Sequence, residues 1–215
     1  SSNLNATLTG DSSLSSRPML RIIRPLEKMN LNIRHNNGFL PIKIKKNNNL
    51  TLLCNHKLTS GSAQVKSAIL LASLGAAGKT TILEKIGSRD HTEIMLKYLG
   101  AKINKKGEKI SLESPNFLKS RDIYIPGDFS SAAFLIVAGL IISRSKITLK
   151  DVGLNYYRIG LIDVLKKMNA RINIKNKRKL NDEEIGDLEV FNSNLKGVSF
   201  TGKISPRMID EYPIV

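Results

Sequence analysis

The sequence predicts a fold of the α/β (α+β) class, because a unit of strands and helices recurs about every 70 residues. Two observations support this prediction. An amphipathic helix pattern followed by a turn and a strand-like run occurs over residues 21–33, 94–103 and 162–172. A second helix pattern, rich in small residues, alternates with the first and is also followed by a strand-like run. Repeated units of this kind indicate sheets covered by helices.

The three amphipathic segments match one another residue by residue. Each carries two apolar side chains three positions apart, which lie on one face of a helix. The residue directly after each pair is of a type that accepts a left-handed helix C-cap. The pairs with their caps are Leu26 and Met29 with Asn30, Leu96 and Leu99 with Gly100, and Leu165 and Met168 with Asn169. The sequence therefore predicts three equivalent helices.

The small-residue helices are expected over residues 62–76 and 130–142, because both segments open with small or hydroxyl residues that suit N-capping. Strands are expected directly after them, over 80–83 and 146–150. The polar, charged stretch 176–184 predicts a surface loop or an insertion in the last unit.

Both ends fit the repeat badly. The chain opens inside a strand-like stretch, residues 4–9, and ends at 209–215, where a third small-residue helix should begin. We therefore expect an internal piece of a longer protein, incomplete at both ends.

The composition raises nucleic-acid binding as an alternative function and argues against a membrane-spanning protein. A net charge of +16 is compatible with a nucleic-acid binder, but the lysines are scattered, and aromatic residues amount to 5% with no Trp. Heavy use of Lys, Ile and Asn is also typical of AT-rich coding sequences. A single cysteine, Cys54, suits a reducing compartment, and no apolar run approaches the ~20 residues of a membrane span. We expect a cytoplasmic protein with no membrane or nucleic-acid partner.

Five short strings are more specific than the repeat. They are residues 9–19, which end in Arg17-Pro18-Met19, residues 62–68, which begin with Ser62-Ala63-Gln64, and residues 88–93, 126–132 and 208–213. Each alone is a weak signal, but five in one order cover nearly the whole chain. Together they resemble the EPSP synthase family of enolpyruvyl transferases. Ala63 and the Ile-Asp-Glu-Tyr-Pro string are similar to the second bacterial class of that family.

The resemblance implies a two-domain fold in which each domain holds three βαβαββ units and the helix N-termini point at the cleft between the domains. It places the crossover between domains near Pro126 and Gly127. Residues 1–126 would then be most of one domain and residues 127–215 the beginning of the second. The resemblance also implies that this chain alone holds part of an active site and is inactive by itself.

The reaction implied by the resemblance transfers the enolpyruvyl group of phosphoenolpyruvate to the 5-hydroxyl of shikimate 3-phosphate and releases phosphate. It implies neither cofactor nor metal, and a monomer is expected. Isolated His35, His56 and His91 also lack the spacing of metal ligands. His91 and Glu93 are expected to cap or pair within their own turn.

Site residues follow from the same resemblance. It implies that Arg17 contacts phosphoenolpyruvate, that Ser62 contacts the phosphate of shikimate 3-phosphate, and that Gln64 reaches both ligands. Ala63, between Ser62 and Gln64, is expected to be a substrate-binding residue as well. It implies further that Arg89 contacts the shikimate phosphate and that Asp210 is the catalytic base. The residues by themselves support simpler roles: a helix N-cap for Ser62, a first-turn polar residue for Gln64 and Asp210, and a surface position for Arg17.

Two alternatives stay open. The UDP-N-acetylglucosamine enolpyruvyl transferase shares the fold and the repeat, although the strings at 17–19 and 62–64 favour the shikimate enzyme. A basic nucleic-acid-binding module of another class would show a salt-sensitive affinity for RNA or DNA.

Overall fold

The computed structural model describes residues 5–46, 53–59, 61–76, 78–114, 117–200, 202 and 204–215. The chain divides into two compact units, one of Ser1–Gly87 with Leu99–Ser120 and one of Ser88–Tyr98 with Arg121–Val215. Both are mixed α/β structures, as the sequence predicts. Within the described residues, no helix has the length and apolar character that crossing a membrane requires.

Within the described residues, the first unit contains two sheets and three helices. Its strands are β1 (Ala6–Leu8), β2 (Asn32–Asn36), β3 (Phe39–Lys45), β4 (Leu53–Leu58), β5 (Gly78–Glu84), β6 (Ile103–Lys106) and β7 (Lys109–Ser114). Its helices are α1 (Ser12–Ser15), α2 (Leu20–Lys28) and α3 (Ala63–Ser73). Helix α3 packs on the sheet and beside α2, which buries Ile69 and Leu70 of α3 together with Ile82 and Ile110 of the strands.

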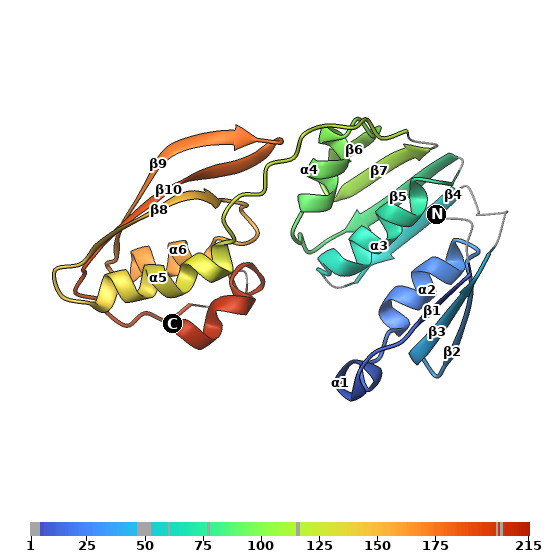
Figure 1. Cartoon of the computed structure of the whole chain (residues 1–215), viewed down its shortest axis with the longest axis horizontal. Helices are drawn as coiled ribbons and strands as arrows, with labels where there is room; N and C mark the ends of the chain where they lie inside the picture. Colours follow the sequence, from blue (N-terminus) through green and yellow to red (C-terminus); the bar gives the residue numbers. More distant parts are fainter. Residues whose placement is uncertain are drawn as a thin grey trace. The chain divides into compact units, whose positions relative to one another are not determined.

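In the part of the chain that the structure describes, the second unit contains one sheet, and α5 and α6 cover one of its faces (Figure 1). Its elements are α4 (His91–Tyr98), α5 (Phe129–Ile141), β8 (Lys146–Gly153), α6 (Gly160–Lys167), β9 (Arg171–Leu180), β10 (Glu183–Phe191) and the 3₁₀ helices η1 (Ser205–Arg207) and η2 (Ile209–Ile214). Its core joins Phe129 and Ile136 of α5, Leu161 of α6, Leu188 of β10 and Met208 before η2.

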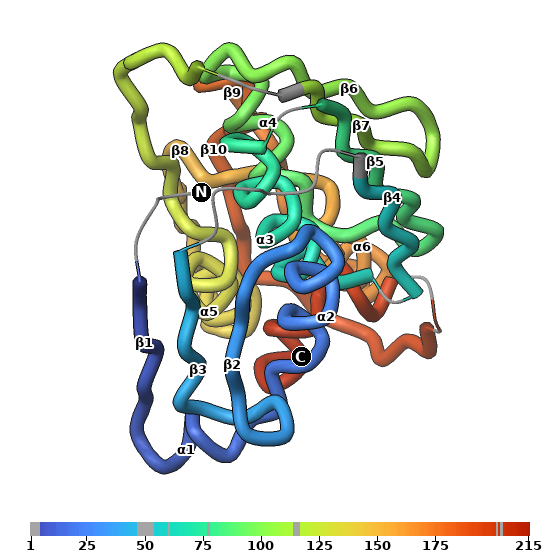
Figure 2. Tube along the Cα trace, turned by 90° about the vertical axis from the view of Figure 1, so that its right-hand side faces the viewer, coloured from blue at the N-terminus to red at the C-terminus, as the bar shows by residue number. Residues whose placement is uncertain are grey.

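The strand order repeats three times. It is β1-β3-β2, which Figure 2 shows side by side, then β5-β7-β6 within the sheet β4-β5-β7-β6, then β8-β10-β9. All of these pairs are antiparallel. In the second copy β4 adds a parallel strand to β5, and in the third Gly127 forms a parallel bridge to Val152 of β8. The predicted repeat is therefore confirmed as a repeated sheet topology.

The predicted left-handed helix caps are also confirmed. Asn30, Gly100 and Asn169 have φ angles of 63°, 91° and 72°. After α2, the Leu31 N–H donates to the Leu26 carbonyl at 3.1 Å, and after α6 the Ala170 N–H donates to the Leu165 carbonyl at 2.9 Å. These are two equivalent Schellman-type helix ends, and each returns the chain directly into a strand.

The expected strands and small-residue helices form with shifted ends. Helix α3 ends at Ser73 rather than at residue 76, α5 runs from Phe129 to Ile141, and β5 and β8 are longer than expected. Of the strand-like residues 4–9, Ala6–Leu8 form β1, and Leu4 lies outside the described residues. The segment at 209–214 forms a short 3₁₀ helix.

The expectation of a surface loop at 176–184 is wrong. This stretch completes β9, turns at Asn181 and Asp182, and begins β10. The turn residues have φ angles of 50° and 65°, as a two-residue hairpin with a type I′ turn requires. A polar sequence forms a strand here because its backbone pairs with β10, whose Ile185 and Leu188 are fully buried.

A buried ion pair connects α3 to β5 in the first unit. Lys66 Nζ lies 3.1 Å from Glu84 Oε2, and their side chains are 0% and 2% exposed. Two charges removed from water in this way depend on one another, because loss of either one leaves the other buried without this opposite charge. The start of α3 is thus fixed to the end of β5.

We expect Lys66→Met to lower the free energy of unfolding by about 3–5 kcal/mol, because it leaves the Glu84 carboxylate buried without this ammonium group. The double variant Lys66→Met with Glu84→Leu should recover a large part of the loss. Denaturant titrations measure the free energy of unfolding of the single and the double variant. The matched control is Lys79→Met, whose pair with Glu113 is exposed, and its effect should stay below about 1 kcal/mol. Equal losses for Lys66→Met and Lys79→Met would contradict the role of the buried pair.

Candidate functional site

The start of α3 carries three of the predicted site residues. Ser62 is the N-cap, and its Oγ accepts a hydrogen bond from the Val65 N–H at 3.4 Å. Ala63 is half-buried and Gln64 is exposed. The first N–H groups of a helix lack partners within the helix and attract anions. The cap and a ligand-binding role are therefore compatible at this position.

Gln64 is held by an arginine that the sequence analysis did not single out. Arg21, in the first turn of α2, donates from Nη2 to Gln64 Oε1 at 2.8 Å. A signal for it exists, since a second arginine follows Arg17-Pro18-Met19 by two positions. The contact itself could not be read from the sequence, because 43 positions separate its partners.

Arg17 follows the short helix α1 and is exposed. Asp11 caps that helix by accepting the Leu14 N–H at 2.7 Å, and the Arg17 N–H donates to the Leu14 carbonyl at 3.1 Å. The backbone at Arg17 is thus fixed by local hydrogen bonds. The predicted convergence of Arg17 with Ser62 and Gln64 on one ligand stays a prediction.

The second unit brings two predicted site residues together. Arg89 Nη1 lies 3.5 Å from Asp210 Oδ2, although 121 positions separate the two residues. Their side chains are 39% and 51% exposed. An exposed ion pair of this length stabilises a fold very little. Both groups thus stay accessible to a ligand from solvent.

Glu211, the neighbour of Asp210, is buried and anchors the turn that carries it. Ser130 Oγ donates to Glu211 Oε1 at 2.5 Å. Arg158 Nη2 donates to Ser130 Oγ at 2.6 Å and to Asp128 Oδ1 at 3.0 Å. This network ties η2 to the start of α5. Arg158 and Glu211 also line a small hollow, together with Arg89, Tyr157, Pro206, Arg207, Ile209 and Asp210.

Asp128 is the N-cap of α5 and accepts the Ser131 N–H at 2.8 Å. Burial, the largest single effect, raises the pKa of Asp128. Hydrogen bonds from Ser131 and the neighbouring Arg158 guanidinium together outweigh burial and hold the pKa below its usual 3.8. Counting from the N-caps, Ser130 in α5 takes the place that Gln64 takes in α3.

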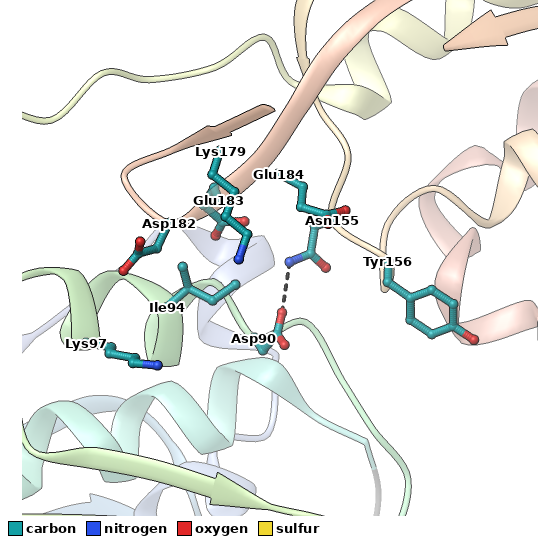
Figure 3. A pocket seen from close by; sticks show the side chains of 9 residues that line it. All are labelled: Asp90, Ile94, Lys97, Asn155, Tyr156, Lys179, Asp182, Glu183 and Glu184. Atoms are coloured by element: carbon teal, nitrogen blue, oxygen red, sulfur yellow. Dashed lines mark hydrogen bonds between the residues drawn. The ribbon is translucent and has the colours of Figure 1, made fainter. Parts of the chain in front are cut away.

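A second hollow in this unit contains none of the predicted site residues. It has a volume of about 440 Å³ and is lined by Asp90, Ile94, Lys97, Asn155, Tyr156, Lys179, Asp182, Glu183 and Glu184 (Figure 3). Asn155 Nδ2 donates to Asp90 Oδ1 at 2.8 Å across it. Its wall carries four acidic side chains and two lysines, a balance that does not suit the anionic ligands implied by the predicted site residues.

The histidines occupy separate places. The expectation that His91 pairs within its own turn is wrong, because its Nδ1 lies 2.6 Å from Glu183 Oε1 of β10. That partner belongs to the hairpin that was expected to be a loop. His56 is buried on β4, and burial together with the Lys28 ammonium lowers its pKa. Over the described part of the chain, no three His, Cys, Asp or Glu side chains form a metal-binding group.

Comparison with known proteins gives one consistent result. The family model for EPSP synthase (3-phosphoshikimate 1-carboxyvinyltransferase) matches residues 1–215. The 3-phosphoshikimate 1-carboxyvinyltransferase of Petrotoga mobilis is 47% identical over 216 residues, which cover 99% of this chain and 50% of that protein. That of Endomicrobium trichonymphae is 45% identical over 212 residues, covering 99% and 49%.

Solved structures agree with these relatives. The EPSP synthase of Acinetobacter baumannii has a TM-score of 0.88 and 39% sequence identity, with 98% of this chain and 48% of that chain covered. The chain therefore spans about half the length of the relatives that it matches.

The lowered pKa of Asp128 predicts that the free energy of unfolding depends on pH. Because its pKa is lowered in the folded state, its ionised form contributes stability above pH 3.8, and this contribution is lost as the pH falls through the lowered pKa. Asp128→Asn keeps a good N-cap oxygen but does not titrate. From about pH 6 to about pH 3, the wild type should lose more free energy of unfolding than the variant. An equal or smaller loss in the wild type, in denaturant titrations at each pH, would contradict the lowered pKa.

Proposed function

Because this chain belongs to the EPSP synthase family, we propose that the protein at its natural full length transfers the enolpyruvyl group of phosphoenolpyruvate to the 5-hydroxyl of shikimate 3-phosphate. The observation that carries the proposal is the family match over residues 1–215. Identities of 45–47% to two 3-phosphoshikimate 1-carboxyvinyltransferases support it. The reaction releases phosphate, and the protein would work in the cytoplasm as a monomer.

We also propose that residues 1–126 belong to one domain and residues 127–215 to the next. The sheet topology supports a change of unit near this point, because Gly127 pairs with β8 as β4 pairs with β5. Gly127 would therefore be the first strand residue of a new βαβαββ unit.

The proposed ligands carry phosphate and carboxylate groups, and the proposed contacts suit them. Arg17 would bind phosphoenolpyruvate, since a planar guanidinium matches its oxygens in a bidentate way. Ser62, Ala63 and Gln64 would present the start of α3 to shikimate 3-phosphate. Arg89 would contact the shikimate phosphate, which requires it to remain reachable, as its exposure allows.

Asp210 would act as the base. It would accept the proton of the 5-hydroxyl as that oxygen attacks the central carbon of phosphoenolpyruvate and a proton adds to the methylene carbon. The resulting tetrahedral adduct would then lose phosphate together with one proton of the new methyl group, which restores the methylene carbon and leaves the enolpyruvyl ether. The half-exposed carboxylate of Asp210 supports this role, since a base needs contact with its substrate.

We expect Arg17→Ala, in the full-length protein, to weaken the binding of phosphoenolpyruvate far more than that of shikimate 3-phosphate. A lost charge-assisted contact corresponds to about 10-fold or more in affinity. Calorimetric titration with each ligand measures the two Kd values. Arg34→Ala is the matched control, because Arg34 is an exposed arginine of the same unit on β2. Equal losses for both ligands would remove Arg17 from the assigned role.

We expect Asp210→Asn to lower kcat by ~10²–10⁴ with little change in substrate affinity, because the amide keeps the shape but removes the base. Release of phosphate in a coupled assay measures the rate. Asp182→Asn is the control, since Asn tolerates the left-handed conformation of Asp182 in the hairpin turn. Full turnover by Asp210→Asn would exclude Asp210 from the mechanism.

A further inference from the structure

We propose that Arg21 is a positioning residue for substrate binding, which acts by fixing the orientation of the Gln64 side-chain amide. The inference rests on the proposed function, in which Gln64 contacts the anionic ligands. Arg21 stands in the first turn of α2 and Gln64 in the first turn of α3. These helices pack beside one another in the first unit, and Arg21 Nη2 donates to Gln64 Oε1 at 2.8 Å.

The chemistry of the two groups fixes which end of the amide faces the arginine. A guanidinium carries five N–H donors and no acceptor, whereas an amide has one acceptor oxygen and one NH₂ group. Only the oxygen of Gln64 is able to bond to Arg21. The bond is charge-assisted, so it is stronger than one between neutral groups. The opposite orientation would place the NH₂ group against a cation.

This orientation of the Gln64 amide offers a hydrogen-bond donor to an anionic ligand. With Oε1 held by Arg21, the NH₂ group of Gln64 is directed away from the guanidinium and offers two hydrogens. Ionised phosphate and carboxylate groups only accept hydrogen bonds. An amide free to rotate would present its oxygen to these anions part of the time, and two facing acceptors repel. Arg21 therefore keeps the amide in the orientation that an anion needs.

The backbone that carries Gln64 is held rigidly at the start of α3. Gln64 lies two positions before Lys66, which is fully buried in its pair with Glu84, and the Lys66 N–H bonds to the Ser62 carbonyl at 3.1 Å. The backbone of Gln64 is thereby fixed, and its side chain is exposed. The remaining freedom is that of the side-chain torsions, which the bond from Arg21 limits.

The test compares Arg21→Ala with Arg24→Ala in the full-length protein. Arg24 is an exposed arginine on the same helix, so both variants remove one positive charge from nearly the same place. Titration calorimetry with shikimate 3-phosphate should give a Kd raised about 10-fold for Arg21→Ala and less than about twofold for Arg24→Ala. The kcat and the unfolding midpoint of Arg21→Ala should stay close to wild type. Arg21→Lys, which also offers only donors, should recover part of the affinity.

A double variant separates positioning from direct contact. If Arg21 acts through Gln64, Arg21→Ala should add less than about a twofold loss in a Gln64→Ala background. An unchanged 10-fold loss in that background would show that Arg21 touches the ligand itself and would overturn the inference. Wild-type affinity in Arg21→Ala would overturn it as well, with the proposed function left standing. A wild-type protein that binds neither substrate would overturn the proposed function and this inference together.

Discussion

The buried ion pair between Lys66 and Glu84 is the interaction on which the first unit's candidate site depends. Its position sets where α3 begins relative to the edge of the sheet, because Lys66 lies in the second turn of α3 and Glu84 is the last residue of β5. Apolar contacts such as those of Ile69 and Leu70 are non-directional and would tolerate small shifts of the helix along its axis. A charged pair with a defined partner tolerates them far less. Ser62 and Gln64 thereby gain a fixed place.

The repeat uses the start of its small-residue helix in two different ways. In α3 the second residue, Gln64, is exposed and held from one side by Arg21. In α5 the equivalent residue, Ser130, is bonded to both Arg158 and the buried Glu211. One helix start therefore carries an exposed side chain, and the other anchors η2, which lies 81 positions later in the chain. The starts of α3 and α5 thus share a backbone arrangement, but their side chains make different contacts.

Local features of the fold could be predicted from the sequence, and features that need a distant partner could not. The left-handed residues Asn30 and Asn169 follow from helix periodicity and cap chemistry within a few positions. The β9-β10 hairpin was missed because its polar residues are paired by a buried neighbour strand rather than by their own pattern. Arg21, Glu211 and the His91–Glu183 pair were missed for the same reason, since each partner is brought close only by the fold. The candidate site residues were predicted from short motif strings, because Ser62 or Asp210 taken alone has the pattern of an ordinary helix start.

The adjacent carboxylates Asp210 and Glu211 show how one short turn divides two tasks. Glu211 points inward, is 3% exposed and accepts a hydrogen bond at 2.5 Å, so its side chain is committed to holding η2. Asp210 points outward, with half of its side chain exposed and its arginine partner 3.5 Å away. A base must be fixed in place yet free to exchange its proton, and a single carboxylate meets both demands poorly. In this turn the backbone of Asp210 is fixed through Glu211, and its own carboxylate stays available for the proposed chemistry.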